Sequence, residues 1–143
     1  MADNFDTFDI ANRANSLSYD ISKILEDQES TVYSFLTNDD SKYFCHFVKS
    51  SANDWGMYFS LDGETSLIAN NGDIYKVMNT IGKIVEEFLL EKSPNKVVMS
   101  AKRAYDGDLR RYNVFKRYSE IYVPDTYDVV DDLDNAILTF QKK

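Results

Sequence analysis

Hydrophobic and polar residues alternate along three consecutive stretches in the first half of the chain. The stretches run from Thr31 to Thr37, from Lys42 to Val48 and from Trp55 to Leu61, and β-branched and aromatic residues are frequent in each. Such alternation is typical of half-buried β-strands. Short polar connections at 38–41 and 50–54 allow neighbouring strands to run antiparallel. The sequence therefore predicts an antiparallel meander.

The middle strand of this meander is apolar on both faces. One face carries Tyr43, Cys45 and Phe47, and the other carries Phe44, His46 and Val48. Most aromatic side chains are expected to fill a core between sheet and helices, whereas an excess on an outer strand face would form an interface. Because neighbours in a strand point to opposite faces, Cys45 and His46 cannot form a catalytic pair, and Cys45 is expected in the core.

A long amphipathic helix is expected from Asp73, its predicted cap, to Lys92. Its apolar residues recur at steps of three and four: Ile74, Val77, Met78, Ile81, Ile84, Val85, Phe88 and Leu89. Gly82 interrupts this stripe at a cost of about 1 kcal/mol relative to Ala, so it either marks a close approach to the sheet or is tolerated. Ser93-Pro94-Asn95 ends the helix, because the residue before a proline is driven out of the α region.

The chain continues with a strand, a helix and a closing strand. Residues 96–101 are apolar and β-branched, as in a strand buried under helices. Asp106-Gly107-Asp108 precedes a helix, one face of which is formed by Leu109, Tyr112, Phe115, Ser119 and Tyr122. The segment from Ala136 to Phe140 is expected to close the sheet.

Three segments have weaker patterns. The segment 16–27 has apolar residues at helical spacing and is predicted as a short helix. The segment 125–134 contains five Asp and no basic residue, and it is predicted as an acidic connection. The segment 120–123 is compatible with a helix end or with a strand.

The order of elements predicts one α+β domain with a mixed sheet: an antiparallel meander, a helix–strand–helix crossover and a closing strand. We place this domain at residues 16–143. Residues 1–15 are polar and are expected to form a flexible N-terminal arm. No internal repeat or linker divides the chain.

Charge and cysteine content narrow the function classes. The net charge of the 143 residues is −8, which disfavours nucleic-acid binding because affinity for phosphates needs many Lys and Arg contacts. An acidic surface that mimics DNA and occupies a DNA-binding protein is an alternative. The single cysteine excludes an internal disulfide and gives no metal-ligand spacing, so no metal is expected.

Neither a signal-peptide pattern nor an apolar run of about 18 residues is present. We therefore expect no membrane partner and a cytoplasmic protein, with later packaging into a larger assembly left open.

Short motifs carry a resemblance to a known fold. Gly72-Asp73 precedes the long helix, Ser93-Pro94-Asn95 breaks it, Ser100-Ala101 ends the next strand, and the second helix contains Arg-Tyr-Asn-Val-Phe-Lys-Arg-Tyr at 111–118. From Thr31 to Phe140 the order of elements resembles that of the GNAT acetyltransferases, and the motifs are similar to those of small tailed-phage proteins of unknown role with this layout. The resemblance implies a phage-encoded protein on a GNAT-like scaffold.

Acetyl transfer on this fold implies a glycine-bearing loop at the start of the long helix, where backbone N–H groups hold the pyrophosphate of acetyl-CoA. The matching residues are Asn70, Asn71, Gly72 and Asp73. This loop has one glycine and no nearby Arg, and the carboxylate of Asp73 would repel phosphate. The cofactor-binding signature is therefore incomplete.

The resemblance also implies a Tyr in the later helix that protonates the leaving thiolate. Phe115 stands at the matching position and has no proton to give. Tyr112 and Tyr118 lie one turn to either side, so one of them is the catalytic candidate if the protein is an enzyme.

Basic residues cluster near the second helix of this acidic chain. Six of them lie within sixteen positions: Lys102, Arg103, Arg110, Arg111, Lys116 and Arg117. They form a candidate interaction patch for an acidic partner or nucleic acid. The alternative is a solvated helix face that is partly neutralised by nearby Asp residues, including the 125–134 run.

Three functional hypotheses follow. The leading one is a non-enzymatic protein-binding or assembly protein on a GNAT-like scaffold, without a cofactor. Its partner is another protein of the virion or the host, and a homo-oligomer is left open. The alternatives are a divergent acetyl-CoA-dependent N-acyltransferase and an acidic DNA mimic that inhibits a DNA-binding enzyme.

Overall fold

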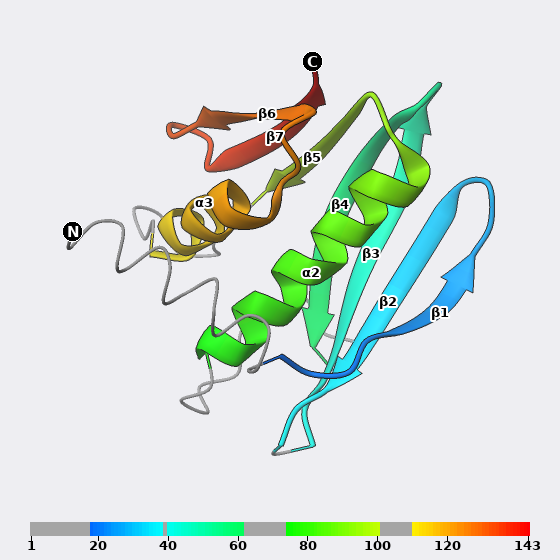
Figure 1. The fold of residues 1–143 in the computed structure, drawn as a ribbon, viewed down its shortest axis with the longest axis vertical. Helices are drawn as coiled ribbons and strands as arrows, with labels where there is room; N and C mark the ends of the chain where they lie inside the picture. The colour runs from blue at the N-terminus through cyan, green and yellow to red at the C-terminus, as the bar shows by residue number, and fades with distance from the viewer. Residues whose placement is uncertain (1–17, 39, 62–73, 101–109) are drawn as a thin grey trace.

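The computed structural model describes residues 18–38, 40–61, 74–100 and 110–143. Within these residues, seven strands form one mixed sheet and two helices lie against it (Figure 1), so the predicted α+β class is confirmed. The strands are β1 (Ser22–Glu26), β2 (Ser30–Leu36), β3 (Lys42–Ser51), β4 (Asp54–Leu61), β5 (Lys96–Ser100), β6 (Tyr127–Asp132) and β7 (Ile137–Lys142). The helices are α2 (Ile74–Lys92) and α3 (Arg110–Tyr122). The predicted arm at 1–15 and the predicted cap Asp73 lie outside the described residues.

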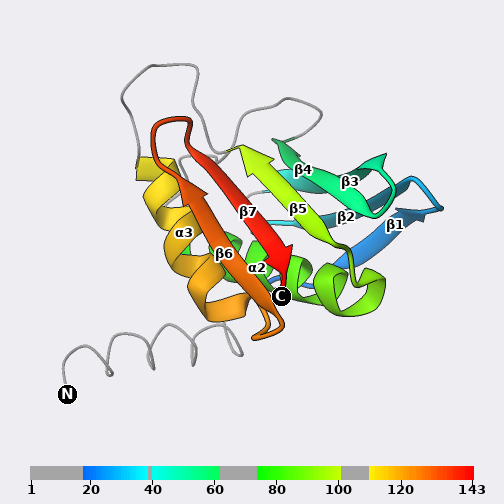
Figure 2. The same cartoon turned by 90° about the horizontal axis from the view of Figure 1, so that it is seen from above.

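The strand order across the sheet is β1-β2-β3-β4-β5-β7-β6 (Figure 2). Strands β1 to β4 pair antiparallel in sequence, which confirms the predicted meander. Strand β5 pairs parallel with β4, and α2 connects the two. Strand β7 lies antiparallel between β5 and β6, which confirms the predicted closing strand.

In the described residues, the parallel pairing between β4 and β5 runs from Asp54 and Lys96 to Met57 and Met99. Strand β4 continues to Leu61, whereas the described part of β5 ends at Ser100. We call the position where this pairing ends the β4–β5 fork.

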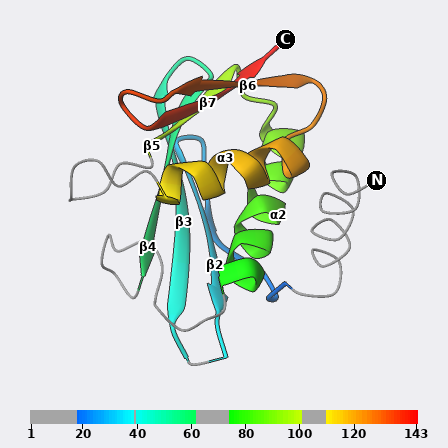
Figure 3. The ribbon, with the colours of Figure 1, turned by 90° about the vertical axis from the view of Figure 1, so that its left-hand side faces the viewer.

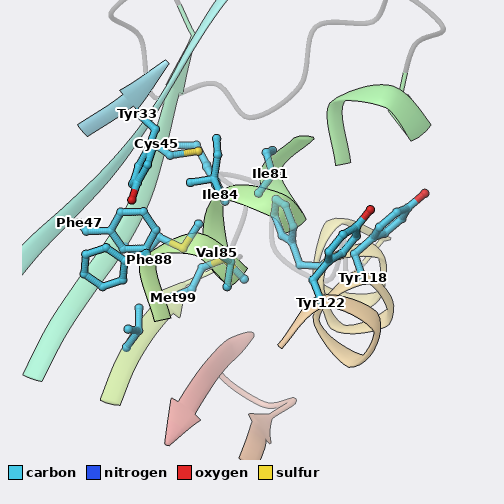
Figure 4. Close-up of a cluster of buried hydrophobic side chains, with 14 of the residues drawn as sticks. Tyr33, Cys45, Phe47, Ile81, Ile84, Val85, Phe88, Met99, Tyr118 and Tyr122 are labelled. Carbon is cyan, nitrogen blue, oxygen red and sulfur yellow. The ribbon is translucent and has the colours of Figure 1, made fainter. Parts of the chain in front are cut away.

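Both helices cover the same face of the sheet, which we call the inner face (Figure 3). The apolar stripe of α2 is buried from Val77 to Leu89, as predicted. Phe88 stacks on Phe47 of β3 with ring centroids 3.9 Å apart and meets the edge of Trp55 at 5.1 Å (Figure 4 shows Phe47 and Phe88). Burying each such side chain stabilises the fold by roughly 1.5–3 kcal/mol. The opposite face, which no described helix covers, is called the outer face.

The break after α2 ties several elements together. The N–H of Ser93 donates to the carbonyl of Leu89, and Ser93 has a φ of 48°, so it ends the helix in a left-handed conformation. The carbonyl of Ser93 accepts hydrogen bonds from the Asn53 amide at 3.1 Å and the Lys142 ammonium at 3.0 Å. The hydroxyl of Tyr127 donates to the carbonyl of Pro94 at 2.6 Å. This segment therefore links α2 to β4, β6 and β7.

The predicted helix at 16–27 is wrong over its described part, because Ser22–Glu26 is strand β1. It pairs antiparallel with β2, and the register shifts between Lys23 and Leu25. An irregularity of this kind displaces the following side chains by one position, which explains the helix-like spacing of the apolar residues. The ammonium of Lys23 lies 2.6 Å from a Glu91 carboxylate oxygen and connects β1 to α2.

The predicted acidic connection at 125–134 is also wrong, because Tyr127–Asp132 is strand β6. Tyr127 is buried, whereas Asp128 and Asp132 are exposed. Strand β6 lies at the sheet edge, and carboxylates on an edge strand discourage pairing with another chain. The acidic composition that masks the strand pattern is therefore suited to an edge. The segment 120–123 is helical up to Tyr122 rather than a strand.

Gly82 marks a close approach to α3 and not to the sheet. A Cβ atom at this position would lie 2.2 Å from Cδ2 of Tyr122. The Tyr122 ring is buried, and its hydroxyl donates to the side-chain oxygen of Asn79 at 3.3 Å. The contact between α2 and α3 therefore requires a residue without a side chain at position 82.

We expect Gly82→Ala to lower the free energy of unfolding by about 1–3 kcal/mol, because the clash with Tyr122 outweighs the roughly 1 kcal/mol gain in helix propensity. Leu90→Ala is the control, since Leu90 is an exposed residue of the same helix and its change should stay within about 0.5 kcal/mol. Urea unfolding measures both variants. Equal stability of Gly82→Ala and the wild type would contradict the close contact.

Ser93→Gly should be more stable than Ser93→Ala by about 1 kcal/mol, because glycine adopts the left-handed conformation without the steric penalty of a Cβ atom. Both variants remove the hydroxyl, so their difference isolates the backbone effect. Thermal or urea unfolding provides the comparison. A more stable alanine variant would show that Ser93 is not strained.

Candidate functional site

The cofactor residues implied by the GNAT resemblance are only partly testable. Asn70, Asn71, Gly72 and Asp73 all lie in the part of the chain that the structure does not describe. The described elements that flank them in the sequence are β4, which ends at Leu61, and α2, which begins at Ile74.

Two stacked rings lie on the inner face of the sheet at the β4–β5 fork. Phe115 of α3 stacks on Phe59 of β4, with ring centroids 5.1 Å apart and planes 24° apart. Phe59 lies two residues beyond Met57, the last β4 residue that pairs with the described part of β5. Both rings are almost fully buried. The residue at the predicted acid position is therefore a core residue.

Tyr118, one of the two predicted catalytic residues, is buried between the helices. With Phe115, Gly82 and Tyr122 it lines an apolar cavity of about 20 Å³ between α2, α3 and the sheet. A cavity needs a volume of about 10–15 Å³ to hold one water molecule. The space beside Tyr118 is therefore about the size of one water molecule and far too small for a cofactor arm. Tyr112 belongs to α3, but its side chain lies outside the described residues.

Of the six residues of the predicted basic patch, only Lys116 and Arg117 have described side chains. Lys102 and Arg103 lie outside the described residues, and so do the side chains of Arg110 and Arg111, whose backbones begin α3. Arg117 is exposed on α3.

Lys116 is paired within the chain. Its ammonium group lies 3.2 Å from a carboxylate oxygen of Asp131 on β6. Both side chains are well exposed, so the pair contributes at most about 1 kcal/mol. For Lys116, the structure supports the neutralised helix face that the sequence left as the alternative.

Cys45 and His46 lie on opposite faces of β3, as predicted. The thiol of Cys45 is fully buried on the inner face, and this burial raises its pKa, which makes the thiolate inaccessible. Among the described residues, no three His, Cys, Asp or Glu side chains gather as a metal site would require. The outer face, with His46, is therefore considered separately.

A stacked pair of rings occupies the middle of the outer face. The imidazole of His46 lies on the ring of Tyr58 in β4, with centroids 4.4 Å apart and planes 3° apart. A hydrogen bond of 3.1 Å joins His46 Nε2 and the hydroxyl of Ser60. Phe44 lies 6.1 Å from the imidazole, and the Lys42 ammonium lies 5.5 Å from the Phe44 ring centroid. Strands β3 and β4 thus present an aromatic cluster away from the helices.

Exposed apolar side chains surround this cluster. The strand registers place five of the nine exposed large apolar residues of the described chain on the outer face: Leu25, Leu36, Val48, Tyr58 and Val130. Exposed apolar residues that gather on one face of a sheet indicate a binding role more strongly than apolar residues scattered singly over the surface. The outer face is therefore the candidate binding surface.

Charged residues on the outer face lie at its margins. Lys42 begins β3, the register pair Asp54 and Lys96 lies at the starts of β4 and β5, and Asp128 and Asp132 belong to the edge strand β6. An uncharged apolar centre with a charged rim is the composition of protein–protein interfaces.

Sequence reasoning assigned Phe44, His46 and Val48 to one face but did not identify Phe59 and Tyr58 as functional residues. The sequence pattern that could have indicated Tyr58 is the second apolar face of the meander. The pattern does not say which face the helices cover, because this depends on the handedness of the connections and not on a local pattern.

Known proteins do not add an assignment: neither a scan against protein-family models nor a search of curated proteins finds a match to this chain. In the described part of the chain, neither helix combines the length and apolarity needed to cross a membrane. The class that the described residues define is an α+β protein with a mixed sheet that the described helices cover on one face.

Protonation of His46 should destabilise the fold. Partial burial lowers the pKa of His46 below its usual 6.5, so the unfolded chain takes up the proton first as the pH falls. The free energy of unfolding should therefore fall as the pH drops from about 6.5 toward the folded pKa. Urea unfolding between about pH 8 and 5.5, compared with His46→Gln, measures this effect. An identical pH dependence in wild type and variant would contradict it.

Proposed function

We propose that this protein is a non-enzymatic protein-binding or assembly protein on a GNAT-like scaffold. The observation that carries the proposal is the uncharged apolar centre of the outer face around His46 and Tyr58. Aromatic side chains with few charges are enriched in the centres of protein interfaces. The partner is another protein, of the virion or of the host, and the resemblance to tailed-phage proteins supports this setting.

Three topological features support the GNAT-like scaffold. The antiparallel meander leads through α2 into β5, which is parallel to β4. Helix α3 follows β5, and β6 and β7 close the sheet. In the described residues, strand β4 also extends beyond its pairing with β5. The resemblance implies that CoA would enter beside these two strands.

The chemistry of the fork argues against acetyl transfer. The stacked rings of Phe59 and Phe115 are buried on its inner side and offer no hydrogen-bond donor to a thioester oxygen or a leaving thiolate. Asp73 adds a negative charge where the pyrophosphate would bind. The same fold can carry different functions, so a GNAT-like scaffold can have core residues where an acetyltransferase has catalytic ones.

Calorimetric titration with acetyl-CoA tests the proposal. We expect no binding tighter than about 1 mM, because stacked rings are buried at the fork and the phosphate position is acidic. Coenzyme A without the acetyl group is the matched ligand and should behave identically. Micromolar binding of acetyl-CoA that weakens on Gly72→Val would overturn the non-enzymatic proposal.

A divergent N-acyltransferase that uses Tyr112 or Tyr118 is the second candidate, because both tyrosines lie about one turn from Phe115 on α3. In this case, an amine attacks the acetyl carbonyl, the C–S bond breaks, and the tyrosine hydroxyl protonates the departing thiolate. The proton lost from the amine nitrogen then restores the hydroxyl. Product formation with acetyl-CoA and a panel of amines is the measurement. Either Tyr112→Phe or Tyr118→Phe should then abolish turnover, whereas Tyr75→Phe on the exposed start of α2 should retain it.

A further inference from the structure

We propose that the outer face binds a second copy of this chain, with the two sheets packed face to face. The inference rests on the proposed function, because it names the partner of the same surface. Three features of the outer face support it. An exposed tyrosine and a glycine lie close together on the central strand, the area of the face suits a dimer, and the face is nearly neutral in an acidic protein.

The exposed tyrosine and the glycine are Tyr58 and Gly56. They are two residues apart on β4, which is the fourth of seven strands across the sheet, and both face outward. Tyr58 is 48% exposed, and its ring stacks against His46 on the neighbouring strand. Gly56 lies between Val48 and Val98 in the register, and among the described residues a Cβ added to it would meet only the Val48 carbonyl, at 3.9 Å. In the described part of the chain, the space above Gly56 is therefore open.

A two-fold axis makes such a surface self-complementary. In an isologous interface, residue i of one copy contacts residue j of the other, and the reverse contact occurs as well. Tyr58 of each copy can then occupy the space above Gly56 of its partner. Because the two residues are neighbours on the central strand, both contacts form close to the axis, where binding energy is usually concentrated.

The area of the outer face is sufficient for a stable dimer. Seven strands at about 4.8 Å spacing, each about 20 Å long, give a footprint of roughly 650 Å² per copy. Two copies would together bury about 1,300 Å², which lies within the range of specific interfaces. Sheets packed about 10 Å apart also match the side-chain lengths of the Val, Leu and Tyr residues on this face.

The charge distribution favours a copy of the chain over a charged partner. Each chain carries a net charge of −8, so two copies repel each other over most of their surfaces. Among the described residues, the outer face holds two Lys against three Asp, all at its margins: Lys42, Lys96, Asp54, Asp128 and Asp132. A basic partner would be attracted to the acidic surfaces outside the outer face. The outer face of a second copy, by contrast, meets no charged residue at the centre of this outer face.

Sedimentation equilibrium of the full chain between about 1 and 100 µM tests the proposal. We expect the wild type to reach twice its 16.5 kDa mass. Tyr58→Lys, which removes the ring and places a charge at the centre, and Gly56→Leu, which fills the space above the glycine, should each raise the dimer dissociation constant at least about tenfold. Tyr75→Lys is the matched control, because Tyr75 is a similarly exposed tyrosine on α2, and it should dimerise as the wild type does.

Circular dichroism establishes that each variant is folded. Tyr58→Lys removes a ring from the outer face, whereas Gly56→Leu adds a side chain to it. A wild type that remains monomeric at about 100 µM, or a dimer that neither Tyr58→Lys nor Gly56→Leu weakens, overturns the inference. The acetyl-CoA titration is a separate readout. If the protein is a monomer that does not bind acetyl-CoA, only the inference that the partner is a second copy is overturned. If it binds acetyl-CoA with micromolar affinity, the proposed non-enzymatic function is overturned, whatever the mass.

Discussion

The packing of α2 across the inner face of the sheet is the interaction on which the remaining structure depends. Phe88 lies between Phe47 and Trp55, and the stripe around it seals the strands from water. The helix can bury its apolar stripe on one face of the sheet only, and Gly82 then allows α3 to settle on the same side. The described helices therefore leave the outer face uncovered, with its own apolar residues exposed.

The same arrangement separates scaffold from chemistry. Helix α3 brings Phe115 onto Phe59 at the β4–β5 fork, so the position that the resemblance assigns to an acid becomes part of the core. The buried tyrosine next to it, Tyr118, has only a water-sized space beside it. The outer face keeps the partly exposed His46 and the exposed Tyr58. A buried core on one face and exposed aromatic residues on the other both follow from the packing of α2.

The sequence predicts those elements whose pattern is local and strong. The stripe of α2 and the alternation of β2 to β4 have clear periods, and the Ser93-Pro94 break is fixed by proline sterics. Strands β1 and β6 were not predicted, and each lies at an edge of the sheet. Strand β1 has a register shift, and strand β6 carries carboxylates in place of apolar residues. The contact of Gly82 with Tyr122 joins residues that are far apart in sequence, so no local pattern indicates it. Likewise, the candidate surface depends on which face the helices cover.

The outer face as the working surface is the central claim, and hydroxyl-radical footprinting of the wild-type chain tests it most directly. Tyr58 and Tyr75 are exposed to similar extents in the single chain, 48% and 54%, and both rings are readily oxidised. The account predicts that oxidation of Tyr58 falls as the protein concentration rises, while oxidation of Tyr75 stays constant. Unchanged oxidation of Tyr58, or parallel protection of both residues, would contradict the claim.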